Sequence, residues 1–166
     1  MTSDANMAAL IVRTIQGDQT TLGVLFDRYA AMVHRTALRL TMSPDEADDV
    51  VQDVFIGLPE ALRHYREHGT FESWLRAIAI RVALMRLRAA RSRENIRPSV
   101  DVPPLGAHEQ QHADRMTLAV ALARLSEEHR TVFMLKVVEG FSHDEISTQL
   151  GIRRGTSEVR LYRAIR

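Results

Sequence analysis

The sequence predicts an all-α protein with two small helical domains, a flexible linker between them, and a helix-turn-helix in the C-terminal domain. Apolar residues recur at spacings of three, four and seven along most of the chain, which is typical of amphipathic helices. No stretch alternates as a strand would, and one proline-containing segment interrupts the helical pattern. We place the domains at 1–93 and 113–166, with the linker at 94–112.

Helices are expected in the N-terminal domain at about 10–15, 22–40, 44–58 and 71–93. The third helix should begin at a capping box of serine and glutamate around Pro44, and Pro59 should bend or break it around Gly57. The residues expected to be buried are Leu22, Leu25, Phe26, Tyr29, Met32, Val33 and Leu40, then Ala47, Val50, Val51, Val54 and Leu58, then Trp74, Leu75, Ile78, Val82 and Leu87.

In the C-terminal domain, two helices divided at a capping serine should cover 116–140. Ser142 and Glu145 form a further capping box that opens a short helix, and Gly151 ends that helix. A last helix over 155–166 completes the helix-turn-helix. Its packed face should hold Leu161, Ala164 and Ile165 with Ser157 behind them, and its open face Glu158, Val159, Tyr162, Arg163 and Arg166.

Composition limits the possible classes of protein. The 166 residues are 45% hydrophobic and 26% charged, which is a globular balance, and the absence of cysteine excludes disulfides and thiolate chemistry. No apolar run reaches the roughly 20 residues that span a bilayer, and no secretory leader opens the chain. We therefore expect a soluble cytoplasmic protein without membrane insertion of its own.

The net charge of +1 hides an uneven distribution, in which every basic residue except Lys136 is arginine. The stretch 41–62 holds six acids and no basic residue. By contrast, 76–97 holds seven arginines against one acid, and 153–166 holds five against Glu158 alone. Arginine forks onto phosphate and guanine, so the two basic blocks favour a nucleic-acid partner. The alternative to a nucleic-acid partner is that the arginines reflect genome composition and that the two basic blocks are helix faces exposed to solvent.

A helix-turn-helix places its second helix in the major groove with the outer face free. On that face Arg163 suits guanine, Glu158 suits the amino group of cytosine, and Val159 suits the methyl group of thymine. Side chains near the turn or on the flank suit phosphate contacts instead, and these are Arg153, Arg154, Thr156 and Arg160.

Four segments in this order resemble the extracytoplasmic-function sigma factors of bacterial RNA polymerase. They are LFDRY at 25–29, DEADDVVQDVF at 45–55, TFESWLRAIAIRVALMRLRAARSR at 70–93, and HDEISTQLGIRRGTSEVRLYRAIR at 143–166. The resemblance covers both domains from about residue 17 to the end. It implies a subunit that directs core polymerase to specific promoters and that an anti-sigma factor holds when free.

The resemblance also implies which residues make contact. The acidic helix would dock on the polymerase clamp through Asp48, Asp49, Gln52, Asp53 and Phe55. The next segment would open the minus-ten promoter element through His64, Tyr65, Phe71, Trp74, Arg76, Arg81, Arg86 and Arg88. Among these, Trp74 lies on the helical stripe and is favoured as a core residue. The C-terminal domain would read the minus-thirty-five element. The residues that would make this contact are Arg153, Arg154, Thr156, Glu158, Val159, Arg160, Tyr162 and Arg163.

The sequence departs from the family pattern at several positions. Arg81 stands where asparagine is usual and Met85 where aspartate is usual, in the segment that opens the strands. In the last helix, Ser157 replaces an apolar residue and Glu158 replaces a basic one, which predicts weaker packing or an altered promoter preference. The chain also ends earlier than is usual, as a truncated sequence would.

Two other functions remain open: a two-domain helix-turn-helix regulator that acts without core polymerase, and a helical adaptor that binds only protein. The first would not explain an acidic helix followed by an aromatic and basic one. The pairs His64 with His68 and His108 with His112 lack further ligands, so we expect no metal site. No glycine-rich phosphate loop or nucleophile elbow is present, and we expect neither enzymatic activity nor a cofactor.

Overall fold

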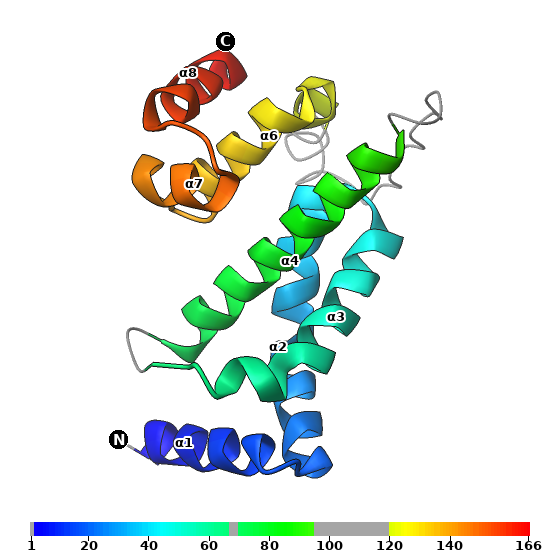
Figure 1. Ribbon diagram of the computed structural model, residues 1–166, viewed down its shortest axis with the longest axis vertical. Helices are drawn as coiled ribbons and strands as arrows, with labels where there is room; N and C mark the ends of the chain where they lie inside the picture. The colour runs from blue at the N-terminus through cyan, green and yellow to red at the C-terminus, as the bar shows by residue number, and fades with distance from the viewer. Residues whose placement is uncertain (1, 67–69, 95–119) are drawn as a thin grey trace, which may run out of the picture. The chain divides into compact units, whose positions relative to one another are not determined.

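The computed structural model describes residues 2–66, 70–94 and 120–166 (Figure 1). These ranges contain helices and their connections and no strand, so the predicted all-α class is confirmed. The chain divides into two compact units, Met1–Ala89 and Ala90–Arg166. The predicted linker lies almost entirely outside the described residues, as does the first part of the helix expected after it. None of the described helices combines the length and apolar composition of a membrane span.

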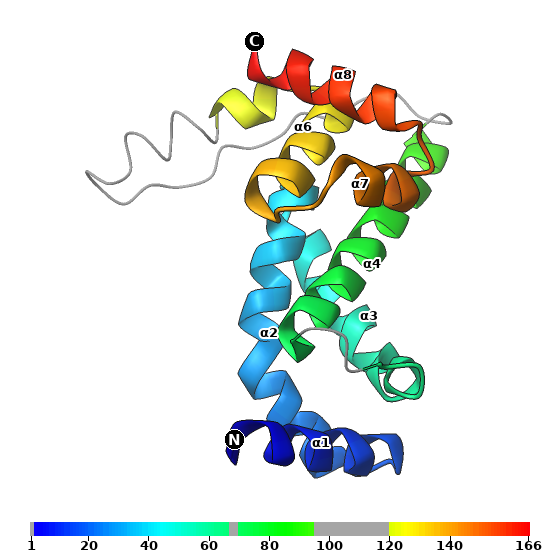
Figure 2. The same cartoon turned by 90° about the vertical axis from the view of Figure 1, so that its left-hand side faces the viewer.

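The first unit contains α1 (Thr2–Ile15), α2 (Gln19–Thr41), α3 (Pro44–Leu62) and most of α4 (Phe71–Glu94). α2 packs along α3, α1 contacts both, and α4 lies against them (Figures 1 and 2). The fully or nearly fully buried apolar side chains of this core are Leu25, Val33, Ala37, Leu40, Ala47, Val50, Val54, Leu58, Leu62, Leu75, Ala79, Ile80 and Ala83. The predicted stripes of α2 and α3 supply most of them.

Local capping sets where α2 ends and α3 begins. Met42 ends α2 in the left-handed region with φ of 56°, an uncommon conformation for a residue with a side chain. Ser43 then caps α3 by accepting a hydrogen bond from the backbone N–H of Glu46. The Glu46 carboxylate does not complete the predicted capping box, because it accepts from the stronger charged donor Arg86 on α4.

The helix α3 continues through Pro59 to Leu62 and changes direction in its last turns (Figure 1). A proline has no N–H to donate to the preceding turn, and its ring pushes that turn aside, so a bend is the expected result. The helix persists beyond the bend because Leu58 and Leu62 are both buried in the core. The prediction of a bend near Gly57 is thus confirmed, and the alternative of a break is wrong.

The buried face of α4 differs from the predicted one. Leu75 is fully buried as expected, but the other predicted core residues are only half-buried, namely Trp74, Ile78, Val82 and Leu87. The buried positions are instead Ala79, Ile80, Ala83 and Leu84. Large side chains dominate the predicted stripe, whereas two of the four buried positions are alanines whose small side chains are fully buried.

The second unit contains α6 (Glu127–Phe133), the π-helix η1 (Met134–Val138), α7 (His143–Leu150) and α8 (Arg154–Ile165). α8 packs on α6 and α7 (Figure 2). Ser126 caps α6 as predicted, and the helical stretch ends before Gly140, but its last turn is π-helical, which periodicity does not reveal. The core of this unit is small and holds Val132, Met134, Leu135 and Ile146.

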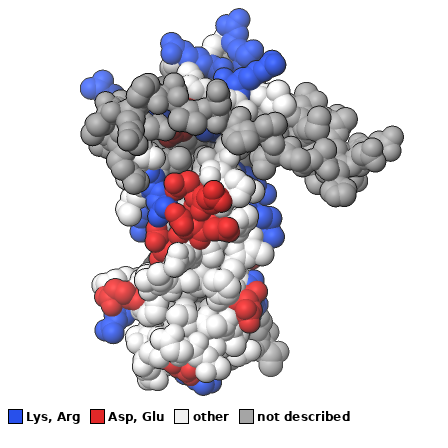
Figure 3. Space-filling model, turned by 90° about the vertical axis from the view of Figure 1, so that its right-hand side faces the viewer, with Lys and Arg blue, Asp and Glu red and all other residues white. Residues whose placement is uncertain are grey.

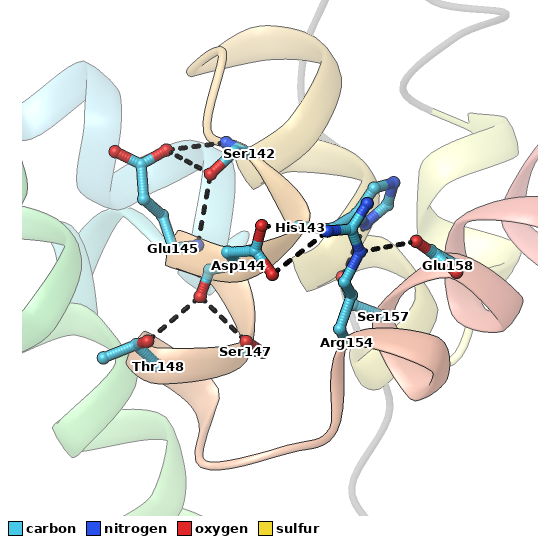
Figure 4. Close-up of polar contacts among 9 residues, drawn as sticks. All are labelled: Ser142, His143, Asp144, Glu145, Ser147, Thr148, Arg154, Ser157 and Glu158. Atoms are coloured by element: carbon cyan, nitrogen blue, oxygen red, sulfur yellow. Dashed lines mark hydrogen bonds and ion pairs between the residues drawn. The ribbon is translucent and has the colours of Figure 1, made fainter.

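The turn between α7 and α8 follows directly from its sequence. The hydroxyl of Ser142 accepts from the N–H of Glu145, and the Glu145 carboxylate accepts from the N–H of Ser142 at 2.8 Å (Figure 4). This is the predicted capping box. Gly151 ends α7 with φ of 64°, a conformation that a glycine adopts without a steric penalty. The predicted helix-turn-helix is confirmed.

Most of α8 presents the faces that the sequence predicted. The expected open face is exposed, and it consists of Glu158, Val159, Tyr162, Arg163 and Arg166. Ile165 is 65% exposed, contrary to the prediction, because α8 ends there and no described element covers its last turn. Ser157 is fully buried, and its hydroxyl lies 2.9 Å from Nδ1 of His143. This hydrogen bond joins α7 to α8 and gives the buried hydroxyl of Ser157 a partner. From the sequence, this serine was expected to weaken the packing of the helix.

We expect Ser142→Ala to lower the free energy of unfolding by about 1 kcal/mol, because the helix loses its capping hydroxyl. Thr148→Ala is the matched control, since this exposed threonine bonds only to a carbonyl within α7 and its loss should change stability by less than about 0.5 kcal/mol. Urea unfolding followed by circular dichroism measures both. Equal losses would contradict the cap.

The same box predicts a pH dependence. Hydrogen bonds from the hydroxyl and backbone N–H of Ser142 hold the pKa of Glu145 below its ordinary value. Because the folded state has the lower pKa, the stabilisation is complete above the ordinary pKa of glutamate and is lost as the pH falls through the folded-state pKa. The stability difference between wild type and Ser142→Ala should therefore shrink in acid. A difference that stays constant down to about pH 3 would contradict this assignment.

Candidate protein-docking and nucleic-acid interfaces

An arginine from α4 lies among the acids of α3. The Arg86 guanidinium donates from Nε to Glu46 at 2.9 Å, from Nη1 to Asp53 at 2.8 Å, and from Nη2 to Asp49. The three carboxylates are spaced one turn apart on one helix face, and a planar guanidinium can serve all of them. These partners, Glu46 foremost, raise the pKa of Arg86 above its ordinary value. Figure 3 shows the acidic side chains gathered on this face, with basic ones beside them.

This placement changes the role expected for Arg86. Its side chain is only 27% exposed, and all three of its nitrogens already bond to carboxylates. The basic block of α4 in the sequence predicts a DNA contact for Arg86. We do not retain it among the proposed DNA contacts, because it neutralises part of the acidic helix instead.

The remaining residues expected to dock on a protein differ in exposure. Asp48 is exposed, with one oxygen 3.3 Å from Nε2 of His34 on α2. Gln52 is exposed, and Asp49 and Asp53 remain about half-exposed beside Arg86. Phe55, in contrast, is buried. The acids are thus available to a partner, whereas Phe55 reaches one only through the groove that it helps to form.

An apolar groove lies between α2 and α3, next to these acids, and is not among the surfaces predicted from the sequence. Phe26 is 43% exposed, although it was predicted to be buried, and its ring meets that of Phe55 edge-on at 4.9 Å between centroids. Ile56, beside them, is 71% exposed. The sequence holds one signal for this groove, because Ile56 is an apolar residue that lies outside the predicted buried stripe of α3. The groove is lined by Gln19, Leu22, Gly23, Phe26, Gln52, Phe55 and Ile56.

We call the groove together with Asp48, Asp49 and Asp53 the acidic-apolar face. It combines exposed carboxylates with exposed apolar side chains, which is the arrangement that suits a protein partner carrying basic and apolar side chains. Arg86 limits its negative charge without removing it. The face therefore has the chemistry expected of the docking helix.

Four aromatic rings form one cluster: Tyr29 on α2, Tyr65 shortly after the end of α3, and Phe71 and Trp74 at the start of α4. Phe71 contacts Tyr29 at 5.2 Å and Tyr65 at 5.8 Å between ring centroids, and Trp74 contacts Tyr65 at 4.8 Å. Phe71 is buried, so it belongs to the core and supports the cluster from within. Tyr65 and Trp74 are half-buried and His64 is exposed, so these three reach the surface. Burial raises the pKa of Tyr29.

The other arginines expected to contact the minus-ten element lie along α4. Arg81 is exposed and makes no ion pair within the described ranges, and Arg88 is exposed. Arg76 pairs with Glu72 one turn earlier at 2.7 Å. Arg81 therefore has an exposed side chain that is open to a new partner.

The arginines of the helix-turn-helix fall into two groups. Arg153 and Arg163 are exposed and form no ion pair with any residue that the structure describes, and Thr156 is exposed as well. Arg160, however, donates to Glu128 on α6 at 2.6 Å, and Arg154 donates to Glu158 at 2.9 Å. The four residues expected to contact phosphate are therefore not equally available.

Within 2–66, 70–94 and 120–166, no three side chains of histidine, aspartate or glutamate gather in a way that could hold a metal ion. His64 is exposed in this part of the chain. The other three histidines of the predicted pairs, His68, His108 and His112, lie outside the described residues.

Comparison with known proteins gives matches over both units. The family described as Sigma-70 region 2 matches residues 25–93, and the one described as Sigma-70, region 4 matches 115–166. The ECF RNA polymerase sigma factor SigL of Mycobacterium tuberculosis is 36% identical over 151 residues, which cover 86% of this chain and 83% of SigL. SigM of the same species is 29% identical over 157 residues, covering 95% of this chain and 80% of SigM.

Solved structures share the fold. The sigma factor RpoE, in complex with the anti-sigma factor NepR from Bartonella quintana, aligns with a TM-score of 0.64 at 22% identity, covering 86% of this chain and 90% of RpoE. CnrH, in complex with the cytosolic domain of CnrY, aligns with a TM-score of 0.55 at 25% identity, covering 94% of this chain and 90% of CnrH. Both comparisons support the helical architecture described above.

The Arg86 cluster yields a prediction about stability. We expect Arg86→Ala to lower the free energy of unfolding by about 1–2 kcal/mol, because three neighbouring carboxylates lose their shared cation in a partly exposed site. Arg81→Ala, on the same helix, removes an exposed arginine without an ion pair and should cost less than about 0.5 kcal/mol. Denaturant unfolding at low and high salt measures both, and the Arg86 effect should shrink as salt rises. Indistinguishable variants would contradict the cluster.

Proposed function

The chain belongs to the extracytoplasmic-function sigma factors of bacterial RNA polymerase, and we propose that it divides promoter recognition between its two units. Residues 1–93 bind core polymerase and open the minus-ten element, 113–166 read the minus-thirty-five element, and 94–112 link them. The observation that carries this proposal is the presence in one chain of the acidic-apolar face and of a helix-turn-helix with an open basic face. The family matches over 25–93 and 115–166 support the same division.

Core polymerase binds the acidic-apolar face in this proposal. Asp48, Asp49, Gln52 and Asp53 are accessible for a basic partner surface, and the groove beside them offers apolar contact through Phe26 and Ile56. Phe55 contributes as a buried side chain of that groove. Apolar contact supplies affinity, whereas the carboxylates orient the encounter and exclude acidic surfaces.

The minus-ten element is opened at the aromatic end of α4. Separated strands are held by stacking on aromatic rings above a positive surface. Tyr65, Trp74 and His64 reach the surface there, and the arginines that supply charge along the helix are Arg76, Arg81 and Arg88. Phe71 acts from within, by holding the rings of Tyr65 and Trp74 in place.

The minus-thirty-five element is read by α8. Arg163, Val159 and Glu158 lie on its exposed face, where they suit base edges, and Tyr162 is exposed among them. Arg153 and Thr156 flank this face and suit phosphate. The ion pair between Arg160 and Glu128 joins α8 to α6. Arg160 can therefore contact a phosphate only if this ion pair breaks, or if its guanidinium bonds to Glu128 and to the phosphate at the same time.

The same surfaces suit regulation by a second protein. RpoE was solved in complex with the anti-sigma factor NepR, and CnrH in complex with the cytosolic domain of CnrY. We extend this to an anti-sigma factor for the present chain, which would occupy the acidic-apolar face and exclude core polymerase. The chain would act in the bacterial cytoplasm by binding alone, without a catalytic step or cofactor of its own.

Reconstituted transcription tests the proposal directly. Purified chain and core polymerase are combined on a supercoiled template that carries upstream regions of the source genome. We expect the chain to comigrate with core polymerase and to produce transcripts from defined start sites. Promoter binding without core polymerase would favour an ordinary helix-turn-helix regulator, and the absence of both activities would favour a protein-binding adaptor.

Gln52→Arg tests the docking surface without removing a partner of Arg86. We expect at least about tenfold weaker binding to core polymerase, because a positive charge enters the acidic-apolar face opposite a basic partner. Gln16→Arg is the matched control, since it places the same charge in an exposed turn outside the groove. Fluorescence anisotropy with labelled chain measures both affinities. Equal affinities would remove this face from the interface.

Arg163→Ala tests the reading of the minus-thirty-five element. We expect a loss of about 1–3 kcal/mol at one base position and a relaxed preference there, because a guanidinium that forks onto guanine would be missing. Competition binding of the polymerase complex to promoters with single base changes measures this. Weakening by the same factor on all sequences would identify a phosphate contact instead.

A further inference from the structure

Arg154 joins two acids on the exposed side of the helix-turn-helix (Figure 4). Its Nε donates to Oε1 of Glu158, one turn further along α8, at 2.9 Å. Its Nη1 donates to the carboxylate of Asp144 on α7, with the shorter contact at 3.1 Å. All three side chains are exposed, so this bridge stands at the surface that the proposed function turns toward DNA.

The bridge fixes one oxygen of Glu158 and leaves the other available. Among the described residues, Arg154 is the side chain that donates to this carboxylate, and it does so at Oε1. Its hydrogen bond also holds the pKa of Glu158 below the ordinary value, so the carboxylate stays ionised and accepts hydrogen bonds only. An unrestrained glutamate would lose rotamer freedom on binding, and a prior restraint reduces that cost.

The chemistry of a carboxylate selects one base in the major groove. Cytosine presents an amino donor there, whereas guanine and thymine present acceptors that repel an acid. Adenine also has an amino group, but its neighbouring N7 is an acceptor and faces the same carboxylate. Oε2 of Glu158 is therefore best matched by the amino group of cytosine.

We propose that Arg154 is a positioning residue for Glu158: anchored on α7 by Asp144, it holds Glu158 so that Oε2 accepts from the amino group of a cytosine in the minus-thirty-five element. This rests on the proposed function, in which α8 reads that element, and it assigns Arg154 to base preference and not to phosphate. Arg154 also offsets part of the repulsion that the two acids would otherwise exert on DNA.

A lysine at this position distinguishes the two roles. Lys keeps the positive charge that a phosphate contact needs, but its single ammonium group lacks the planar fork that spans Asp144 and Glu158. Arg154→Lys should therefore keep the general affinity for DNA and lose the preference for cytosine at one position. A phosphate contact would show retained affinity and an unchanged preference.

The decisive experiment measures a double-mutant cycle in the polymerase complex. Affinities are determined for promoters with each minus-thirty-five base pair varied, using wild type, Glu158→Ala, Arg154→Ala and the double variant. We expect each single variant to lose about five- to tenfold discrimination for cytosine at the same position. The double variant should lose no more than either single one, because both substitutions remove one interaction.

Two further variants complete the design. Arg153→Ala is the matched control, since this neighbouring arginine has no described ion pair and should weaken binding by the same factor on every sequence. Asp144→Asn removes the anchor's charge and should lower the same cytosine preference as Arg154→Ala. Circular dichroism confirms that these surface variants keep their helices.

Three results would overturn the proposal: uniform weakening by Arg154→Ala, altered preference at a different position from Glu158→Ala, or additive losses in the double variant. The proposed function fails separately. If the wild-type complex shows no dependence on the minus-thirty-five sequence, α8 does not read that element at all. If that dependence is present and the cycle is additive, only the positioning role is wrong.

Discussion

The shared ion pairs of Arg86 join α4 to the acidic helix α3 of the N-terminal unit. Glu46, Asp49 and Asp53 lie one turn apart on α3 and would repel one another without a cation between them. That cation comes from a neighbouring helix, so the same contact that neutralises the acids also holds α4 in place. The carboxylates stay about half-exposed and keep enough charge for a basic partner. Stability and docking therefore draw on one set of side chains.

Arginines serve two purposes in this chain, and the structure separates them. Arg86 and Arg160 bond to carboxylates on other helices of their own unit, and Arg154 bridges α7 and α8. Arg81 and Arg163 are exposed and have no ion pair in the part of the chain that the structure describes. Arg81 and Arg163 can contact a polyanion without breaking an ion pair, whereas Arg86, Arg154 and Arg160 cannot. A count of basic residues treats both groups alike and so overstates the DNA-binding surface.

Local interactions could be predicted from the sequence, whereas contacts between distant segments could not. The capping box at Ser142 and the end of α7 at Gly151 depend on neighbours in the chain, and both formed as expected. The partners of Arg86 lie 33 to 40 residues away, and no local pattern identifies them. The exposure of Phe26 and its groove likewise depends on how α2 and α3 pack. Apolar spacing indicates a buried face but not where a neighbouring helix stops covering it.

We propose that this chain gives core polymerase its promoter choice, because each of its two units reads a separate promoter element. Mapping transcript start sites across the genome after overproduction of the chain tests this most directly. We expect new start sites that share two short sequence elements at constant spacing, one element for each unit. New start sites that share one element only, or chromosomal binding without new transcripts, would contradict it.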